Sequence, residues 1–254
     1  MKRSEFIKAI GAGTLSAFLS GAANAKPTAA MGRETDFSQL VVNCFGDSTT
    51  WGDNGIKSGG NGIAWPAKLQ KILGFKEVRN FGKKGSRLAV TADRNDSFIE
   101  RLGELPEAGD IILVLGGVND FQHDVPLGNL GDADEHTFYG ALDKLLVKLL
   151  AKYPQKKLIF MTPMKNRFQH PTKHYPDSFT ANRQGLKQVD YVEAIRTACD
   201  YYSVPVFDLY RESGISPFHE VQAKLFMPDC LHYNEAGYER LAQRIAEYLK
   251  NSEL

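Results

Sequence analysis

Short apolar runs alternate with helical stretches along most of this 254-residue chain. Five apolar runs are expected as strands, over residues 40–45, 77–80, 110–115, 157–161 and 205–207. Five helical patterns follow or separate them, over residues 64–73, 88–102, 135–152, 184–202 and 235–250. Parallel strands need such crossovers, because a tight turn can join only antiparallel ones. The sequence therefore predicts an α/β fold, a three-layer α/β/α sandwich with a central parallel five-stranded sheet.

Polar and glycine-containing motifs follow four of the five expected strands. Ser48 follows the first, Gly82 to Gly85 follow the second, Gly117 to Asp120 follow the third and Asp208 follows the fifth. The carboxyl ends of parallel strands lie at one edge of the sheet, and ligands of open α/β sheets bind there. We therefore expect a single functional site at this edge.

The N-terminus has the pattern of an export signal. A basic start precedes a run of small and apolar residues over 9–19, which leads into Ala23-Asn24-Ala25. We interpret residues 1–25 as a signal peptide cleaved after Ala25, which leaves one domain over 26–254 and predicts a secreted or periplasmic protein. The apolar run is too short to span a bilayer, so we expect no stable membrane insertion after cleavage. An uncleaved anchor is the alternative, and the export route stays open.

The charge balance bears on the partners. The chain has 31 Lys and Arg residues against 30 Asp and Glu residues. Such a balance does not favour nucleic acid or a charged membrane surface, so we expect neither as a partner. A small molecule or a glycan fits better as a substrate, and the oligomeric state is not fixed by the sequence.

The cysteines and histidines do not predict a metal site. Cys44, Cys199 and Cys230 lack metal-type spacing, and we expect at least two of them to be buried free thiols, although a disulfide stays open. His170 and His174 have the spacing of a helical zinc pair, but the prolines around them favour an irregular loop. No metal is therefore expected.

Three residues have the chemistry that acyl transfer requires. Ser48 ends the motif Gly46-Asp47-Ser48, and Asp229 and His232 stand just before the last expected helix. Serine is a poor nucleophile unless an imidazole takes its proton, and a carboxylate must orient that imidazole. Each motif taken alone would also suit a capped turn.

Four blocks of the sequence resemble a known family when they are taken together. Residues 46–52, 80–85, 115–120 and 229–237 are similar, in order, to the first, second, third and fifth blocks of the GDSL lipase and esterase group, the SGNH hydrolases. Three positions depart from the family pattern: Thr49 replaces a leucine, Cys230 a glycine and Tyr233 a proline. These departures remove no reacting group.

The resemblance implies a flavodoxin-like fold and a role for each matching residue. Ser48 is expected to attack an ester carbonyl, His232 to take and return its proton, and Asp229 to hold the imidazole. The oxyanion hole is expected to consist of the backbone N–H groups of Ser48 and Gly85 and the side-chain amide of Asn119. No cofactor is required.

Substrate contacts are less well defined by the sequence. Residues 164–183 follow the fourth strand and are the candidate specificity segment, which includes Arg167 and Tyr175. Trp51, Asn54 and Phe121 flank the catalytic blocks and are expected to line an acyl or sugar pocket.

The sequence therefore favours a secreted serine carboxylester hydrolase that removes short acyl groups, such as acetyl, from carbohydrate. A lysophospholipase or acyl-thioesterase of the same family is the alternative within the enzyme class. A non-catalytic carbohydrate-binding protein on the same scaffold is the alternative of another class.

Overall fold

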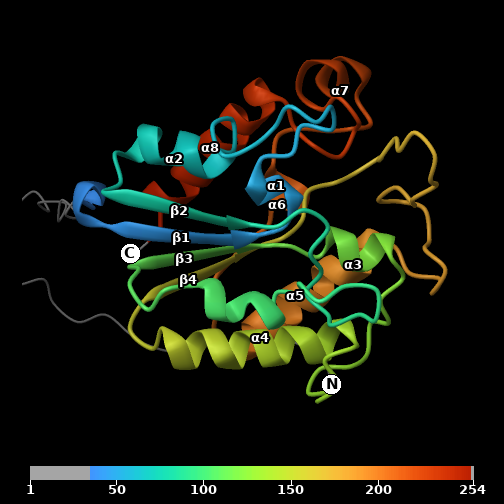
Figure 1. Ribbon diagram of the computed structural model, residues 1–254, viewed down its shortest axis with the longest axis horizontal. Coiled ribbons are helices and arrows are strands. Elements are labelled where there is room, and N and C mark those ends of the chain that lie inside the picture. Colours follow the sequence, from blue (N-terminus) through green and yellow to red (C-terminus); the bar gives the residue numbers. More distant parts are fainter. Residues whose placement is uncertain (1–34, 253–254) are drawn as a thin grey trace, which may run out of the picture. The chain divides into compact units, whose positions relative to one another are not determined.

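A computed structural model of the protein describes residues 35–252, and the predicted signal peptide lies outside the described residues. Five parallel strands form one sheet (Figure 1): β1 (Val41–Gly46), β2 (Glu77–Gly82), β3 (Ile111–Leu115), β4 (Lys157–Met161) and β5 (Val206–Phe207). Their order in the sheet is β2-β1-β3-β4-β5. The prediction of a parallel five-stranded α/β fold is confirmed.

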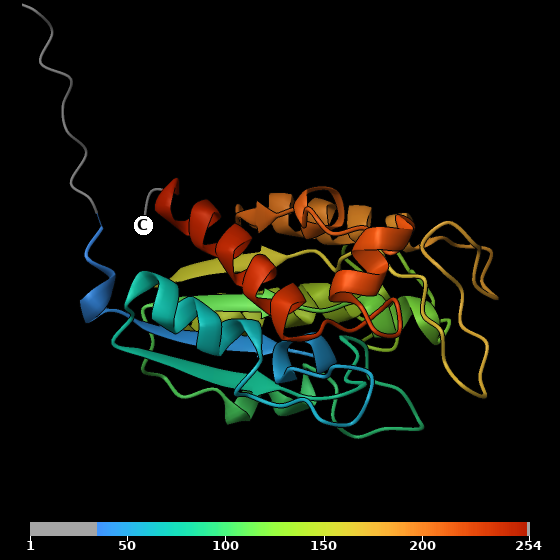
Figure 2. The ribbon, with the colours of Figure 1, turned by 90° about the horizontal axis from the view of Figure 1, so that it is seen from above.

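Helices cover both faces of the sheet (Figures 1 and 2). The helices α2 (Trp65–Leu73) and α8 (Glu235–Lys250) lie side by side on one face, while α4 (Phe138–Lys152) and α5 (Gln188–Tyr201) cover the other. The shorter helices are α1 (Ser48–Trp51), α3 (Val118–Gln122), α6 (Leu209–Glu212) and α7 (Glu220–Phe226), with 3₁₀ turns at Phe37–Gln39 and Glu100–Glu104. None of the helices within residues 35–252 is both long and apolar enough to cross a bilayer.

Alternate residues of the central strands belong to the two cores. On β3, Ile112 and Val114 pack into the core beneath α4 and α5, whereas Leu113 and Leu115 pack into the core beneath α2 and α8. Both faces of such a strand are buried, so its sequence is continuously apolar and does not alternate. This burial explains why the strands were readable from the sequence.

The prediction of helical turns over residues 88–102 is wrong. Only a 3₁₀ turn at Glu100–Glu104 forms there, and the rest is irregular. The backbone N–H groups of Leu88 and Ala89 each donate to the buried carboxylate of Asp120, at 3.0 Å. A helix would have needed a different course of the backbone, and the Asp-Arg-Asn-Asp-Ser run that follows favours turns.

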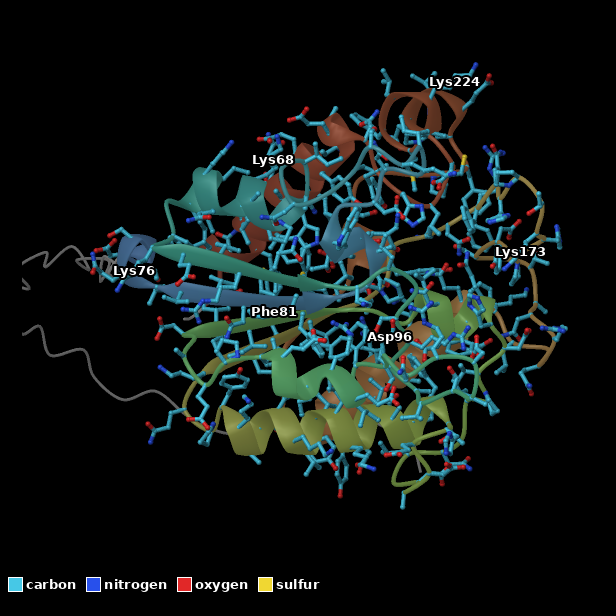
Figure 3. The ribbon with its side chains drawn as sticks, viewed as in Figure 1. Lys68, Lys76, Phe81, Asp96, Lys173 and Lys224 are labelled. Atoms are coloured by element: carbon cyan, nitrogen blue, oxygen red, sulfur yellow. The ribbon has the colours of Figure 1, made fainter. Side chains whose placement is uncertain are left out.

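The carboxyl edge of the sheet carries the long connections. In Figure 3, Lys76 lies near the amino ends of the strands, and Lys173 lies at the opposite end of the molecule, in the connection between β4 and α5. This connection extends beyond the sheet (Figure 2). It includes the candidate specificity segment, which therefore lies at the edge where the catalytic blocks end.

Candidate active site

The end of β1 places Ser48 at the start of a short helix. Gly46 closes the strand, and Asp47 caps α1 by accepting a hydrogen bond from the backbone N–H of Thr49 at 2.9 Å. A Cβ atom at Gly46 would lie 2.0 Å from the hydroxyl oxygen of Thr50, so only glycine fits there. Ser48 is the first helical residue, and its backbone N–H has no partner within the helix.

Ser48, His232 and Asp229 form a continuous hydrogen-bonded chain. The Ser48 Oγ lies 3.0 Å from His232 Nε2, and His232 Nδ1 lies 2.7 Å from Asp229 Oδ2. The other carboxylate oxygen of Asp229 accepts the backbone N–H groups of Leu231 and His232 at 3.0 and 2.7 Å. Burial alone would raise the pKa of Asp229, but these hydrogen bonds and the neighbouring imidazole hold it below its ordinary value. The carboxylate is therefore ionised and fixes the imidazole.

The loop that carries this Asp and His turns at an unusual residue. Cys230 has φ +61°, in the left-handed region that favours glycine, the residue that usually stands here in the family the sequence resembles. Its carbonyl accepts the backbone N–H of Arg167 at 2.9 Å, and the carbonyl of Asp229 accepts that of Gln169 at 2.9 Å. Two backbone hydrogen bonds thus attach the catalytic loop to the candidate specificity segment.

The expected oxyanion donors lie on the elements that flank Ser48. The register of β1 and β2 pairs Gly46 with Gly82, so the turn that holds Gly85 runs beside Ser48. Gly85 has φ +74°, and a Cβ atom there would lie 2.9 Å from the guanidinium of Arg94. On α3, the Asn119 amide donates to the carbonyl of Ser86 at 3.1 Å.

Asp47 is a buried carboxyl directly beside the predicted nucleophile. Its Oδ2 lies 3.5 Å from the amide nitrogen of Asn119, a long contact that adds little stabilisation. Burial raises the pKa of Asp47 to about 6, although hydrogen bonds and the nearby charges of His232 and Arg101 partly oppose this. Asp47 therefore takes up a proton more readily than an exposed aspartate does.

The structure adds a charged pair that sequence reasoning missed. The carboxylate of Asp53 lies 3.8 Å from His232 Nε2 and 2.7 Å from the ammonium of Lys84. That ammonium also lies 4.8 Å from the centre of the Trp51 ring. Asp53 and Lys84 stand in or next to two of the motif blocks, but no pattern in the sequence pairs them.

Two of the five residues expected to contact substrate, Phe121 and Asn54, have side chains that are engaged within the fold. Phe121 is fully buried and packs against Tyr191, with ring centres 5.7 Å apart, so it belongs to the core and not to a substrate pocket. The Asn54 side chain closes its own turn by accepting the backbone N–H groups of Ile56 and Ser58 at 3.2 Å. Both side chains are occupied within the fold.

The other three, Trp51, Arg167 and Tyr175, are partly exposed at the carboxyl edge. The Arg167 guanidinium lies 3.6 Å from the Cys230 sulfur, and Trp51 contacts Lys84 as described above. Tyr175 stacks on Phe168, with ring centres 5.4 Å apart and planes at 23°. Phe168 in turn packs perpendicular to the His232 imidazole, at 5.7 Å. A row of rings thus runs from His232 to Tyr175.

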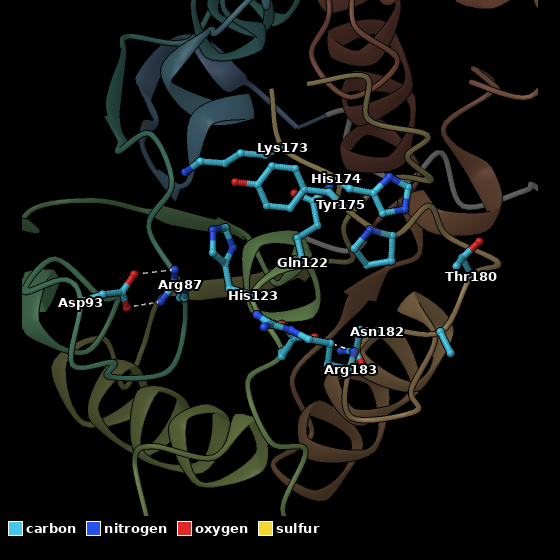
Figure 4. Close-up of a pocket in the computed structure, with 13 residues that line it drawn as sticks. Arg87, Asp93, Gln122, His123, Lys173, His174, Tyr175, Thr180, Asn182 and Arg183 are labelled. Carbon is cyan, nitrogen blue, oxygen red and sulfur yellow. Dashed lines mark hydrogen bonds and ion pairs between the residues drawn. The ribbon is translucent and has the colours of Figure 1, made fainter. Parts of the chain in front are cut away.

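A cavity of about 800 Å³ opens beyond Tyr175 (Figure 4). It lies between residues 173–183 on one side and Arg87, Asp93 and the end of α3 on the other. None of Ser48, Asp229 and His232 lines it, so it is a neighbour of the triad and does not contain it. Tyr175 connects the two, because it lines the cavity and also stacks on the ring that contacts His232.

His170, which was considered as a zinc ligand, uses its ring nitrogen within its own loop. The Nδ1 of His170 accepts the backbone N–H groups of Thr172 and Lys173, at 3.1 and 3.0 Å. The three cysteines are buried free thiols.

Comparisons with known proteins agree with this geometry. The profile of the GDSL-like lipase/acylhydrolase family matches residues 44–240. One solved structure is 54% identical, covers 85% of this chain and 98% of its own, and superposes with a TM-score of 0.81. A protein from Lactobacillus plantarum is 31% identical, with 85% and 99% coverage and a TM-score of 0.73. No curated protein matches significantly.

A carbohydrate acetylesterase family member from Sinorhizobium meliloti is only 19% identical but shares the fold, with a TM-score of 0.59 and coverage of 83% of this chain and 97% of its own. The family profile spans all four motif blocks. The chain therefore belongs to the GDSL-like lipase/acylhydrolase family and is an ester hydrolase.

Proposed function

We propose that the protein is a serine carboxylester hydrolase that removes short acyl groups, above all acetyl, from carbohydrate. The hydrogen-bonded chain from Ser48 through His232 to Asp229 is the observation that carries this proposal. Its distances are those of a nucleophile in contact with its base and of a base held by its orienting carboxylate.

The reaction follows from these contacts. His232 Nε2 takes the proton of Ser48 Oγ as that oxygen attacks the ester carbonyl, and Asp229 stabilises the imidazolium. The imidazolium then protonates the leaving alcohol, which departs as the acyl-enzyme forms. Water repeats the sequence and releases the acid and the free serine. Both half-reactions need the same base.

The negative charge of each tetrahedral intermediate needs donors that are already in place. In this proposal the donors are the backbone N–H groups of Ser48 and Gly85 and the Asn119 amide. One such donor is worth roughly 10²–10³ in rate. The bond from Asn119 to the Ser86 carbonyl holds the amide through one of its two hydrogens, and the second, which has only the long 3.5 Å contact with Asp47, is the one left to donate to the oxyanion.

The chemistry of the cavity beside the triad supports a carbohydrate substrate. Three formal cations, two carboxylates and several amide and imidazole groups line it, together with Tyr175. Sugars present many hydroxyl groups, and such a lining can donate to them and accept from them. A long acyl chain would need an apolar channel, so this polar cavity suits the alcohol half of an ester and not the acyl chain. The likeness to a carbohydrate acetylesterase family member points the same way.

Hydrolysis of p-nitrophenyl acetate and p-nitrophenyl decanoate by the chain that starts at Lys26 tests this function, with Ser48→Ala as the control. We expect turnover of the acetate that is lost in Ser48→Ala. Faster turnover of the decanoate would favour a lipid substrate. If neither ester gives serine-dependent turnover, and acetylated sugars bind without being cleaved, the non-catalytic carbohydrate-binding alternative replaces the proposal.

We further propose that the protein is exported and cleaved after Ala25. The basic start and the small, apolar run that ends in Ala23-Asn24-Ala25 support this. Intact mass measurement of the natural protein should give a chain that begins at Lys26, and a full-length cytoplasmic chain would contradict it.

A further inference from the structure

The leaving alcohol must lie against His232, because that imidazole protonates it. Phe168 packs on His232, with ring centres 5.7 Å apart, and Tyr175 stacks on Phe168. The alcohol half of a substrate larger than a simple ester therefore extends along these rings. The next space that it meets is the cavity lined by Tyr175.

The cavity wall that contains Tyr175 is connected to the predicted oxyanion site through His123. His123 ends α3, the helix that carries Asn119, and its ring centre lies 5.4 Å from that of Tyr175. The Nδ1 of His123 lies 2.9 Å from the Asn119 carbonyl, which can only accept, so Nδ1 carries the hydrogen. Burial, with the charge of Arg87, lowers the pKa of His123, so its Nε2 is an acceptor at neutral pH. Tyr175 and His123 thus offer an aromatic wall with a hydroxyl and a ring nitrogen.

The three cationic side chains that line the cavity differ in whether they form ion pairs. Arg87 is paired with Asp93 through two hydrogen bonds of 2.6 and 3.0 Å, and Arg183 is paired with Asp124 at 2.8 Å. Lys173 is the third formal cation, and no carboxylate within residues 35–252 forms an ion pair with it. In Figure 4, Lys173 lies next to Tyr175, and the His123 ring lies beside the Tyr175 ring. The cavity therefore has one uncompensated positive charge beside an aromatic wall.

We propose that this cavity is the subsite for the alcohol half of the ester and that it selects a sugar unit bearing a carboxylate. The sugar ring packs against Tyr175 and His123, and the carboxylate pairs with Lys173. Lys173 is exposed, so water hydrates its ammonium beside a neutral sugar, whereas a carboxylate on the sugar forms an ion pair with it. This inference rests on the proposed esterase function and adds the class of its substrate.

The test compares two matched esters, a mono-O-acetylated methyl glucuronoside and the corresponding acetylated methyl glucoside. Acetate release gives kcat/KM for each, and their ratio removes any general effect on catalysis. We expect the wild type to prefer the glucuronoside by about two- to fivefold, the range of an exposed ion pair. Lys173→Gln should bring the ratio close to one, mainly through KM. Lys148→Gln, at an exposed lysine on α4 outside the cavity, should keep the wild-type ratio.

A second measurement does not depend on turnover. Ser48→Ala should bind the acetylated glucuronoside more tightly than the glucoside in a titration, and Ser48→Ala with Lys173→Gln should lose this preference. Equal ratios in wild type and Lys173→Gln, or a wild-type preference for the neutral sugar, would overturn the subsite. Serine-dependent cleavage of p-nitrophenyl acetate with no cleavage or binding of either sugar would also overturn it, yet leave the esterase. Loss of serine-dependent cleavage on every ester would instead overturn the proposed function.

Discussion

Replacement of Asp47 by asparagine is expected to stabilise the protein at neutral pH and not at acidic pH. Burial raises the pKa of Asp47 from its ordinary 3.8 to about 6. The folded state therefore binds this proton more tightly than the unfolded state, and the stability that this provides is complete below about pH 4 and lost as the pH rises through about 6. Asparagine stays neutral throughout.

The size of the effect follows from the difference in pKa. The pKa of Asp47 is about two units higher in the folded state than in the unfolded state, and each unit corresponds to roughly 1.4 kcal/mol. Above pH 7 the wild type is therefore destabilised by up to about 3 kcal/mol. The side chain is only 2% exposed, so solvent screening does not reduce this figure much. Asparagine caps helices about as well as aspartate, so the cap of α1 is kept.

Urea unfolding followed by fluorescence, at a series of pH values from about 4 to 8, measures this difference. The free energy of unfolding of Asp47→Asn should exceed that of the wild type by up to about 3 kcal/mol above pH 7, and the difference should shrink toward pH 4. Burial also raises the pKa of Asp120 to about 6, but that group is present in both proteins and its effect cancels. A difference that does not change with pH would refute the reasoning.

Three further predictions address the site. Ser48→Ala and His232→Ala should be almost equally inactive toward p-nitrophenyl acetate, while Asp229→Ala keeps more activity, because the orienting residue is the least costly of the three to lose; equal losses in all three would contradict this. Asn119→Ala should lower kcat roughly 10²–10³-fold with a small change in KM, as steady-state kinetics can show. Cys230→Val, which places a β-branched residue at φ +61°, should cost at least about 1 kcal/mol in thermal unfolding, whereas Cys230→Gly should not.

Much of the fold could be predicted from local patterns. The run Ile111–Leu115 is apolar throughout because both of its faces are buried, and this signal needs no knowledge of its neighbours. Its end at the carboxyl edge then places Asn119 near Ser48 by topology alone. The predicted triad residues do lie within hydrogen-bonding distance of one another.

Other features depend on contacts between distant parts of the chain. Residues 88–102 were predicted to be helical, but Asp120, far along the chain, accepts the backbone N–H groups of Leu88 and Ala89. The packing of Phe168 on His232 and the pairing of Asp53 with Lys84 also depend on how irregular loops meet. Phe121 was assigned to a pocket because it follows a catalytic block, yet the interior face of α3 buries it.

The two backbone hydrogen bonds from residues 167 and 169 to residues 230 and 229 tie the catalytic loop to the segment that lines the neighbouring cavity. The two segments are consequently one mechanical unit, so an insertion or exchange that reshapes the cavity also moves the support of the Asp229 carboxylate. In a lineage that changes its substrate, recognition and turnover would then have to evolve together. Laboratory evolution of this enzyme should accordingly progress faster through side-chain changes at the cavity wall than through changes in the length of that segment.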